Sequence, residues 1–316
     1  MKILILGTGA VGSFYGSLLA RQGATVAVVA RADYPVVHAH GIHVHSEAGL
    51  GDYHFRPATV LAVGETPNHP FDYVLVCTKM VAGVDRVGLL QPVLGAATRI
   101  VLIANGVDIE AEVAEAFPHN PLISGLAFVC VSRTAPGQVR HQSQGRLVLG
   151  DFPAGVSEQT RSLVEAFRRG GIRCQASADI IMERWQKCVW NAAFNPLSVL
   201  CGGLDTAALL ATEEPQIRAI MTEICRIAAA LAHPLPTDLV DKMIENTRAM
   251  PPYQTSMLLD FAAGRPLETE AIVGNAVRAG RRAGIPVPRL EAVYAAMTAT
   301  PPVPPARTGN GKAGRT

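Results

Sequence analysis

The sequence contains little of what marks membrane, secreted and nucleic-acid-binding proteins. It has no run of about 18 uncharged apolar residues, so we expect no transmembrane helix. Residues 1–6 lead directly into a glycine turn without a small-residue cleavage site, so we expect no secretory leader. Charged residues make up only 17% of the chain and the net charge is +2, which is too weakly basic to indicate binding to nucleic acid.

Cysteine is also sparse and scattered, and the six cysteines form no C-x-x-C pair: Cys77, Cys130, Cys174, Cys188, Cys201 and Cys225. The spacing indicates neither a disulfide framework nor a zinc site. We therefore expect reduced, buried thiols of a cytoplasmic protein.

A group of histidines is the other pattern that suggests metal: His38, His40, His43 and His45. Their alternating spacing places some of them on one face of a strand. We interpret the segment as a solvated hairpin rather than a metal site, because no carboxylate or cysteine completes the ligand set.

Apolar residues, in contrast, make up 49% of the 316 residues. A chain of this length has a prior of about two domains, at roughly 150 residues each, and buries about 75% of its unfolded surface. This composition is too apolar for a disordered chain.

The first half alternates short apolar runs with helical patterns. Continuous runs at 2–6, 25–30, 72–78 and 99–104 predict strands that are buried on both faces, and residues 11–21 have helical spacing. These segments predict a parallel, doubly wound α/β sheet of Rossmann type over residues 1–178. Two segments differ. Residues 40–63 predict hairpin strands or a long excursion, and residues 122–149 predict further β-structure with a Pro136-Gly137 turn inside it.

The second half shows only helical spacing. We expect helices at 180–195, 213–232, 238–247, 255–263 and 268–283, which form an all-α domain over residues 179–299. The segment 300–316 contains four prolines and three glycines and no aromatic residue, so we expect it to be disordered.

A glycine-rich motif follows the first predicted strand and opens the first predicted helix: Gly7, Thr8, Gly9, Ala10, Val11 and Gly12. In this strand–turn–helix context the G-x-G-x-x-G pattern predicts a dinucleotide site. Gly7 permits the tight turn, Gly9 lets the backbone approach a pyrophosphate, and Gly12 lets the helix pack on the sheet. The helix N-terminus supplies N–H donors to the phosphates.

Arg31 stands directly after the second strand, where an NAD-binding chain usually has an acidic residue. A guanidinium group suits a 2′-phosphate, so NADP is favoured over NAD. Asp33 is a competing candidate two residues further on. Lys79 and Asn105 follow the next two predicted strands, at the edge of an open α/β sheet where ligands bind.

In the helical half, Lys187, Asn191 and Asn195 recur every four residues and form one stripe of a helix. Apolar neighbours surround them, so we expect the stripe to line a polar cavity, with a solvent-facing stripe as the alternative. Pro196 is expected to disturb this helix near Asn195.

Ser256 and Glu268 are candidates for the same cavity, although spacing alone does not place them there. The alternative for Glu268 and Glu270 is a pair of surface acids in the first turn of a helix.

Together these residues resemble the ketopantoate reductases (2-dehydropantoate 2-reductases) over nearly all of residues 1–298. The resemblance is carried by the following motifs: the glycine loop 7–12, Arg31, Cys77-Thr78-Lys79, Asn105-Gly106-Val107, Lys187 with Asn191 and Asn195-Pro196-Leu197, Ser256-Met257-Leu258-Leu259-Asp260, and Gly264-Arg265-Pro266-Leu267-Glu268.

The resemblance implies NADPH-dependent reduction of 2-dehydropantoate to pantoate, on the way to pantothenate and coenzyme A, in a cleft between the two domains. It further implies that Lys187 is the general acid and that Asn191, Asn195 and Ser256 bind substrate. By the same resemblance, Glu268 contacts the cofactor and supports Lys187, while Lys79 and Asn105 face cofactor and substrate. No metal is needed, since lysine supplies the electrophilic group.

Two departures from the family pattern bear on the substrate. Ala104 stands where a glutamine is frequent, and Gly203-Leu204-Asp205 stands where a further substrate-binding asparagine is frequent. An acid there repels a carboxylate unless it turns away. The alternatives are therefore another 2-keto acid as substrate, or a non-catalytic NADP-binding sensor. Apolar positions over 217–231 either pair between subunits in a homodimer or complete the core of one chain.

Overall fold

The computed structural model describes residues 1–68 and 70–300 and divides into two compact units. The N-terminal unit ends at Arg184, and the C-terminal unit begins at Trp185, six residues after the boundary expected from sequence. Apart from Thr300, the segment predicted to be disordered lies outside the described residues.

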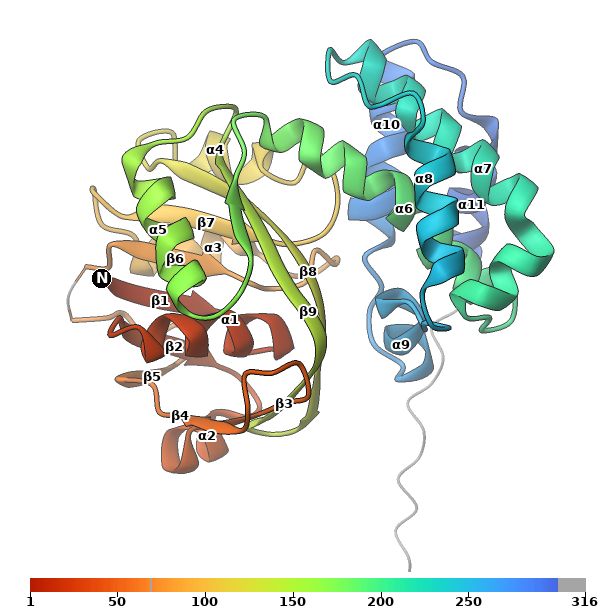
Figure 1. Ribbon diagram of the computed structural model, residues 1–316. Coiled ribbons are helices and arrows are strands. Elements are labelled where there is room, and N and C mark those ends of the chain that lie inside the picture. The colour runs from red at the N-terminus through yellow and green to blue at the C-terminus, as the bar shows by residue number, and fades with distance from the viewer. Residues whose placement is uncertain (69, 301–316) are drawn as a thin grey trace, which may run out of the picture. The chain divides into compact units, whose positions relative to one another are not determined.

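The N-terminal unit is built on one sheet, whose strand order is β4-β3-β9-β8-β7-β6-β1-β2-β5, with β10 paired to β9 (Figure 1). The strands are β1 (Lys2–Leu6), β2 (Thr25–Ala30), β3 (Ile42–Ser46), β4 (Tyr53–Phe55), β5 (Thr59–Ala62), β6 (Tyr73–Val76), β7 (Arg99–Ile103), β8 (Leu122–Ala135), β9 (Gln138–Asp151) and β10 (Cys174–Ala176). The run from β5 through β1 to β8 is parallel, which confirms the predicted Rossmann-type sheet.

The predicted β-structure over 122–149 is confirmed, whereas 40–63 is a hairpin only in part, because β5 pairs with β2 in parallel. β8 and β9 form a long antiparallel pair that turns at Pro136-Gly137, and β3 pairs antiparallel with β4. β6 and β7 end earlier than predicted, at Val76 and Ile103. Residues 77–79 and 104–106 therefore belong to the loops at the carboxyl edge of the sheet.

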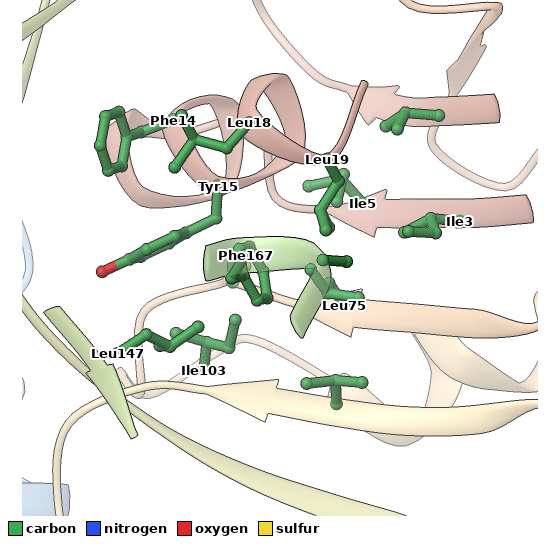
Figure 2. Packing of buried hydrophobic residues seen from close by; sticks show 14 of the residues in the cluster. Ile3, Ile5, Phe14, Tyr15, Leu18, Leu19, Leu75, Ile103, Leu147 and Phe167 are labelled. Carbon is green, nitrogen blue, oxygen red and sulfur yellow. The ribbon is translucent and has the colours of Figure 1, made fainter. Parts of the chain in front are cut away.

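The helices of this unit are α1 (Ala10–Arg21), α2 (Tyr34–His40), α3 (Arg86–Leu90), the short η1 (Gln91–Val93), α4 (Ala111–Ala116) and α5 (Glu158–Arg169). Figure 2 shows how α1 packs on the sheet, with Phe14 and Leu18 on the helix and Ile5 on β1. Burying a large apolar side chain stabilises the fold by about 1.5–3 kcal/mol. This packing holds the start of α1 against the ends of β1 and β6.

The four histidines of the sequence pattern are divided between two elements. His38 and His40 lie in α2, whereas His43 and His45 lie on the exposed face of β3. His45 Nδ1 lies 2.7 Å from Asp52, and the described residues contain no group of three metal-ligating side chains.

The six cysteines are free thiols. Cys77, Cys174 and Cys188 are buried, as predicted, but Cys130, Cys201 and Cys225 are partly exposed, so full burial was wrong for half of them. Burial raises the pKa of Cys77 and of Cys174 to about 12, which keeps both protonated at neutral pH.

The C-terminal unit is helical over its described residues. Its elements are α6 (Ile180–Leu200), which begins in the N-terminal unit, α7 (Thr206–Ala230), α8 (Leu239–Ala249), α9 (Ser256–Ala262), the π-helix η2 (Glu270–Gly274), α10 (Asn275–Arg282) and α11 (Pro288–Ala299). None of the helices in the described part of the chain is both long and apolar enough to span a membrane.

Three details differ from the expected helices. α6 continues through Pro196 to Leu200, because Leu197 and Val199 are buried and their packing outweighs the missing N–H of the proline. α7 begins at Thr206, seven residues before the expected start, because Asp205 caps it by accepting the Ala208 N–H at 2.9 Å. α11 was not predicted from the sequence.

The apolar face of α7 is used inside the single chain. Ile217, Ile220 and Ile224 are fully buried, and α7 packs against α8, α10 and α11. These residues therefore complete the core of one chain, and a homodimer stays a prediction with no support from this face.

Candidate functional site

The glycine loop lets three backbone segments pack closely. Gly7 has φ +97°, and a Cβ there would lie 3.0 Å from the backbone of Cys77 and Thr78. A Cβ on Gly12 would lie 2.1 Å from the Gly7 carbonyl oxygen. Only glycine fits at these two positions, so the roles predicted for Gly7 and Gly12 in the turn and in helix packing agree with the structure.

The same loop leaves the N-terminus of α1 open. Gly9 is the N-cap residue, no side chain caps the helix, and its first turn contains no acidic residue. A Cβ on Gly9 would meet no atom within 4 Å. The first N–H groups of a helix have no intrahelical partners, so those of Ala10 and Val11 are available to an anion placed over Gly9.

Thr8 contributes through its backbone, because its hydroxyl donates to the Val29 carbonyl at 3.3 Å and is buried. Thr78, in contrast, has a buried Oγ1 without a hydrogen-bond partner among the described residues. Its Cγ2 is 3.1 Å from the position of a Cβ on Gly7, so this hydroxyl lies beside the glycine loop. The sequence analysis assigned no role to Thr78, because a neutral hydroxyl gives no signal beside the charged candidate Lys79.

An apolar cavity of about 80 Å³ completes this region. Leu6 and Val29, at the ends of β1 and β2, line it together with Val63, Leu89, Pro92 and Val93. Gly64, Glu65 and Gly88 also line this cavity. The open N-terminus of α1 and the unpaired Thr78 hydroxyl, both at the glycine loop, fit the phosphates of a dinucleotide.

The two candidates at the end of β2 differ in their surroundings. Arg31 is exposed, directly after Ala30. The Asp33 carboxylate is buried and accepts a hydrogen bond from Arg133 at 3.1 Å. Asp33 is therefore occupied by β8, whereas Arg31 is accessible to a ligand.

Lys79 and Asn105 follow β6 and β7; β6 lies next to β1 in the sheet, and β7 lies next to β6. Lys79 is exposed and Asn105 is half-buried. Because the carboxyl ends of parallel strands meet at one edge, the structure brings these two residues to the same edge as the glycine loop and Arg31.

In the C-terminal unit, the α6 stripe is largely enclosed. Lys187 is half-buried, while Asn191 and Asn195 are 8% and 1% exposed. The solvent-facing alternative is therefore wrong for the two asparagines. The Asn195 Nδ2 group is buried and has no hydrogen-bond partner among the described residues. An unpaired buried donor costs about 1–3 kcal/mol, so this amide is suited to an acceptor brought by a ligand.

Two residues that sequence reasoning missed connect this stripe to α9. The Ser198 hydroxyl donates to the Asn195 carbonyl at 2.7 Å and lies 2.7 Å from Thr255 Oγ1. Thr255 caps α9 by accepting the Leu258 N–H at 3.1 Å. Ser256, the first residue of α9, is exposed and is held next to the end of the asparagine stripe.

The two acidic residues near η2 separate clearly. Glu270 is half-exposed and accepts hydrogen bonds from Arg278 at 2.9 Å and from Tyr294 at 2.5 Å. Glu268 is only 8% exposed. The surface-acid alternative therefore holds for Glu270 and is wrong for Glu268.

The Asp205 carboxylate caps α7 by accepting a hydrogen bond from the Ala208 N–H group. The repulsion expected between this acid and a substrate carboxylate is reduced by that arrangement.

Comparison with known proteins gives two adjacent family matches. Residues 3–154 match the model of ketopantoate reductase PanE/ApbA, and residues 179–300 match its C-terminal domain. The chain belongs to the ketopantoate reductase family. It is therefore an oxidoreductase that uses a nicotinamide cofactor.

Individual relatives agree with the family match. The crystal structure of 2-dehydropantoate 2-reductase from Methylococcus capsulatus is 57% identical with a TM-score of 0.90, and the match covers 94% of this chain and 96% of that one. The 2-dehydropantoate 2-reductase of a Nostoc species is 30% identical, with 93% of each chain covered. D-mandelate dehydrogenase with NADH and anilino(oxo)acetate, at 21% identity and a TM-score of 0.84, covers 95% of this chain and shares the fold.

Two glycine substitutions are expected to separate folding from cofactor binding. Gly12→Ala forces a Cβ against the Gly7 carbonyl and is expected to lower the free energy of unfolding by roughly 1–3 kcal/mol or more. Gly9→Ala places its methyl group in open space, so it is expected to cost about 1 kcal/mol or less while weakening the binding of the nicotinamide cofactor.

Thermal unfolding and NADPH fluorescence titration measure the two effects. The interpretation of the loop is contradicted if Gly9→Ala binds NADPH as tightly as the wild type.

Proposed function

We propose that this ketopantoate reductase family member reduces 2-dehydropantoate to pantoate with NADPH, as a step of pantothenate and coenzyme A biosynthesis. The names of the Methylococcus and Nostoc relatives support the substrate. The observation in this chain that carries the proposal is the Asn195 amide, a buried donor without a partner among the described residues, on the stripe that also bears Lys187. A small keto acid supplies the acceptor oxygens that this donor lacks.

The cofactor choice rests on the end of β2. A ribose 2′-OH requires an acidic acceptor there, but the Asp33 carboxylate is buried against Arg133. A 2′-phosphate requires a cation, which exposed Arg31 supplies. The NADH-bound relative of the same fold shows that the fold alone does not set this choice.

Arg31→Ala is expected to raise the KM for NADPH roughly 10- to 100-fold, because a hydrogen bond to a charged group contributes about 1.5–3 kcal/mol. The KM for NADH should change little. Steady-state kinetics with both cofactors measure this, with Arg161→Ala, an exposed arginine on α5, as the matched control. The proposed preference is contradicted if the wild-type enzyme binds NADH as tightly as it binds NADPH.

When bound, the cofactor would supply the hydride from its dihydronicotinamide ring, and the remaining groups come from the chain. Lys187 donates a hydrogen bond to the carbonyl oxygen of the substrate, stabilises the developing alkoxide and then protonates it. Asn191 and Asn195 orient the substrate without adding charge, and the Ser256 hydroxyl holds it. We assign Glu268 to support Lys187 and contact the cofactor, and Lys79 and Asn105 to face cofactor and substrate.

Lys187→Ala is expected to lower kcat by roughly 10²- to 10⁴-fold, the usual contribution of a positioned acid. Lys242→Ala on α8 is the control, since that lysine is exposed and paired with Asp238 at 2.6 Å. If the kcat of Lys187→Ala stays within about threefold of the wild-type value, Lys187 is not the proton source for the alkoxide.

Ser256→Ala is expected to raise the KM for the keto acid more than it lowers kcat, because a hydroxyl that binds substrate and transition state alike contributes to both states equally. Thr222→Ala, an exposed hydroxyl on α7 bonded to its own helix, is the control. An unchanged KM would show that Ser256 does not bind substrate.

The function itself is tested by NADPH oxidation on mixing with 2-dehydropantoate, followed by a panel of branched 2-keto acids. The highest kcat/KM for 2-dehydropantoate supports the proposal. A higher value for another keto acid reassigns the substrate, and no oxidation with any of them favours the non-catalytic sensor.

A further inference from the structure

Arg184 is a charged residue that is almost wholly buried, with 2% exposure, and no role in the proposed reaction accounts for it. It lies on α6, at the end of the N-terminal unit, and all of its hydrogen-bond partners belong to that unit. Burying a guanidinium group is costly unless its donors are paired. The identity of those partners is therefore informative.

One nitrogen of Arg184 holds both carbonyls that flank Asn105. Its Nη1 group donates to the Ala104 carbonyl at 2.9 Å and to the Gly106 carbonyl at 3.2 Å. Gly106 has φ +107°, a conformation that residues with a side chain rarely adopt, so glycine suits this position of the loop. The guanidinium therefore holds the peptide group that precedes Asn105 and the one that follows Gly106, and this restricts the backbone of the loop that carries the Asn105 side chain.

The other nitrogens anchor the guanidinium itself. The Nε–H group donates to the Glu110 carboxylate and, at 2.9 Å, to Ser124 Oγ. The Nη2 group donates to the Gly125 carbonyl at 3.3 Å. Ser124 Oγ in turn donates to Glu110 at 2.6 Å. The loop after β7 is therefore tied to the buried start of β8 through one planar group. A lysine has a single nitrogen and cannot reach this fork of acceptors.

Stability alone is a weak reason for such a group, because apolar residues of similar volume commonly replace a buried ion pair without loss. We propose that Arg184 is a positioning residue that fixes the Asn105 loop in its reactive geometry. This inference rests on the proposed function, in which Asn105 faces cofactor and substrate. A misplacement of about 1 Å in such a group is enough to cost roughly 10²-fold in rate.

The first test is a double-mutant cycle between Arg184→Lys and Asn105→Ala, read as kcat/KM for 2-dehydropantoate. In the wild-type background, Arg184→Lys is expected to lower kcat/KM by roughly 10- to 100-fold. In the Asn105→Ala background it is expected to have less than a twofold effect, since the group it positions is gone. Equal effects in both backgrounds, or no effect in the wild-type background, overturn the proposal.

Arg86→Lys is the matched control. Arg86 is also largely enclosed, with a side chain 13% exposed, but it pairs with Glu112 on α4 at 2.7 Å rather than with the carbonyls of Ala104 and Gly106. It is expected to leave kcat/KM unchanged. A loss as large as that of Arg184→Lys would mean that any weakened arginine pair in this unit lowers activity, and would overturn a specific role for Arg184.

A second readout does not depend on turnover. Amide hydrogen exchange over residues 103–110, measured by mass spectrometry, is expected to accelerate at least tenfold in Arg184→Lys and not in Arg86→Lys. Unchanged exchange in an active enzyme overturns the role of Arg184 and leaves the proposed function standing. Accelerated exchange in a protein whose wild type does not oxidise NADPH supports the hold on the loop and contradicts the proposed function instead.

Discussion

The pairing of polar groups buried along α6 is the constraint on which the rest of this structure depends. Arg184 meets five acceptors in the N-terminal unit, and Ser198 meets the Asn195 carbonyl and Thr255. The Asn195 amide, between them, has no partner in the described chain. Paired groups stabilise the fold and specify its loops, whereas the unpaired one costs free energy, which the proposed substrate would recover by supplying an acceptor.

The glycine loop also combines closely packed groups with polar groups that are left open to a ligand. Close contact between Gly12 and the Gly7 carbonyl brings α1 against the ends of β1 and β6. That packing uses the inner side of the loop and leaves the N-terminus of α1 without a side-chain cap and the Thr78 hydroxyl without a partner in the described chain. Dense packing on one side therefore produces unsatisfied donors on the other, which suits an anionic cofactor.

Much of the fold was accessible from local patterns. Continuous apolar runs predicted the parallel strands, and apolar residues at helical spacing predicted most of the helices. Both patterns depend only on neighbours in the chain. Predictions failed where a distant contact decides. α6 passes through Pro196 because buried side chains on both sides hold the helix. Asp205 seemed a candidate for repelling substrate, yet it caps α7.

The sequence by itself determined the glycine loop, the cation after β2 and the Lys187–Asn191–Asn195 stripe, since each is set by residue type at short spacing. Only the tertiary structure decided that Asp33 is occupied by Arg133, that Ser198 reaches Thr255, and that Arg184 holds the Asn105 loop. These partners stand 100, 57 and 80 residues apart. Periodicity carries information about neighbours three or four positions away, so contacts across such separations emerge only when the sheet and helices have packed.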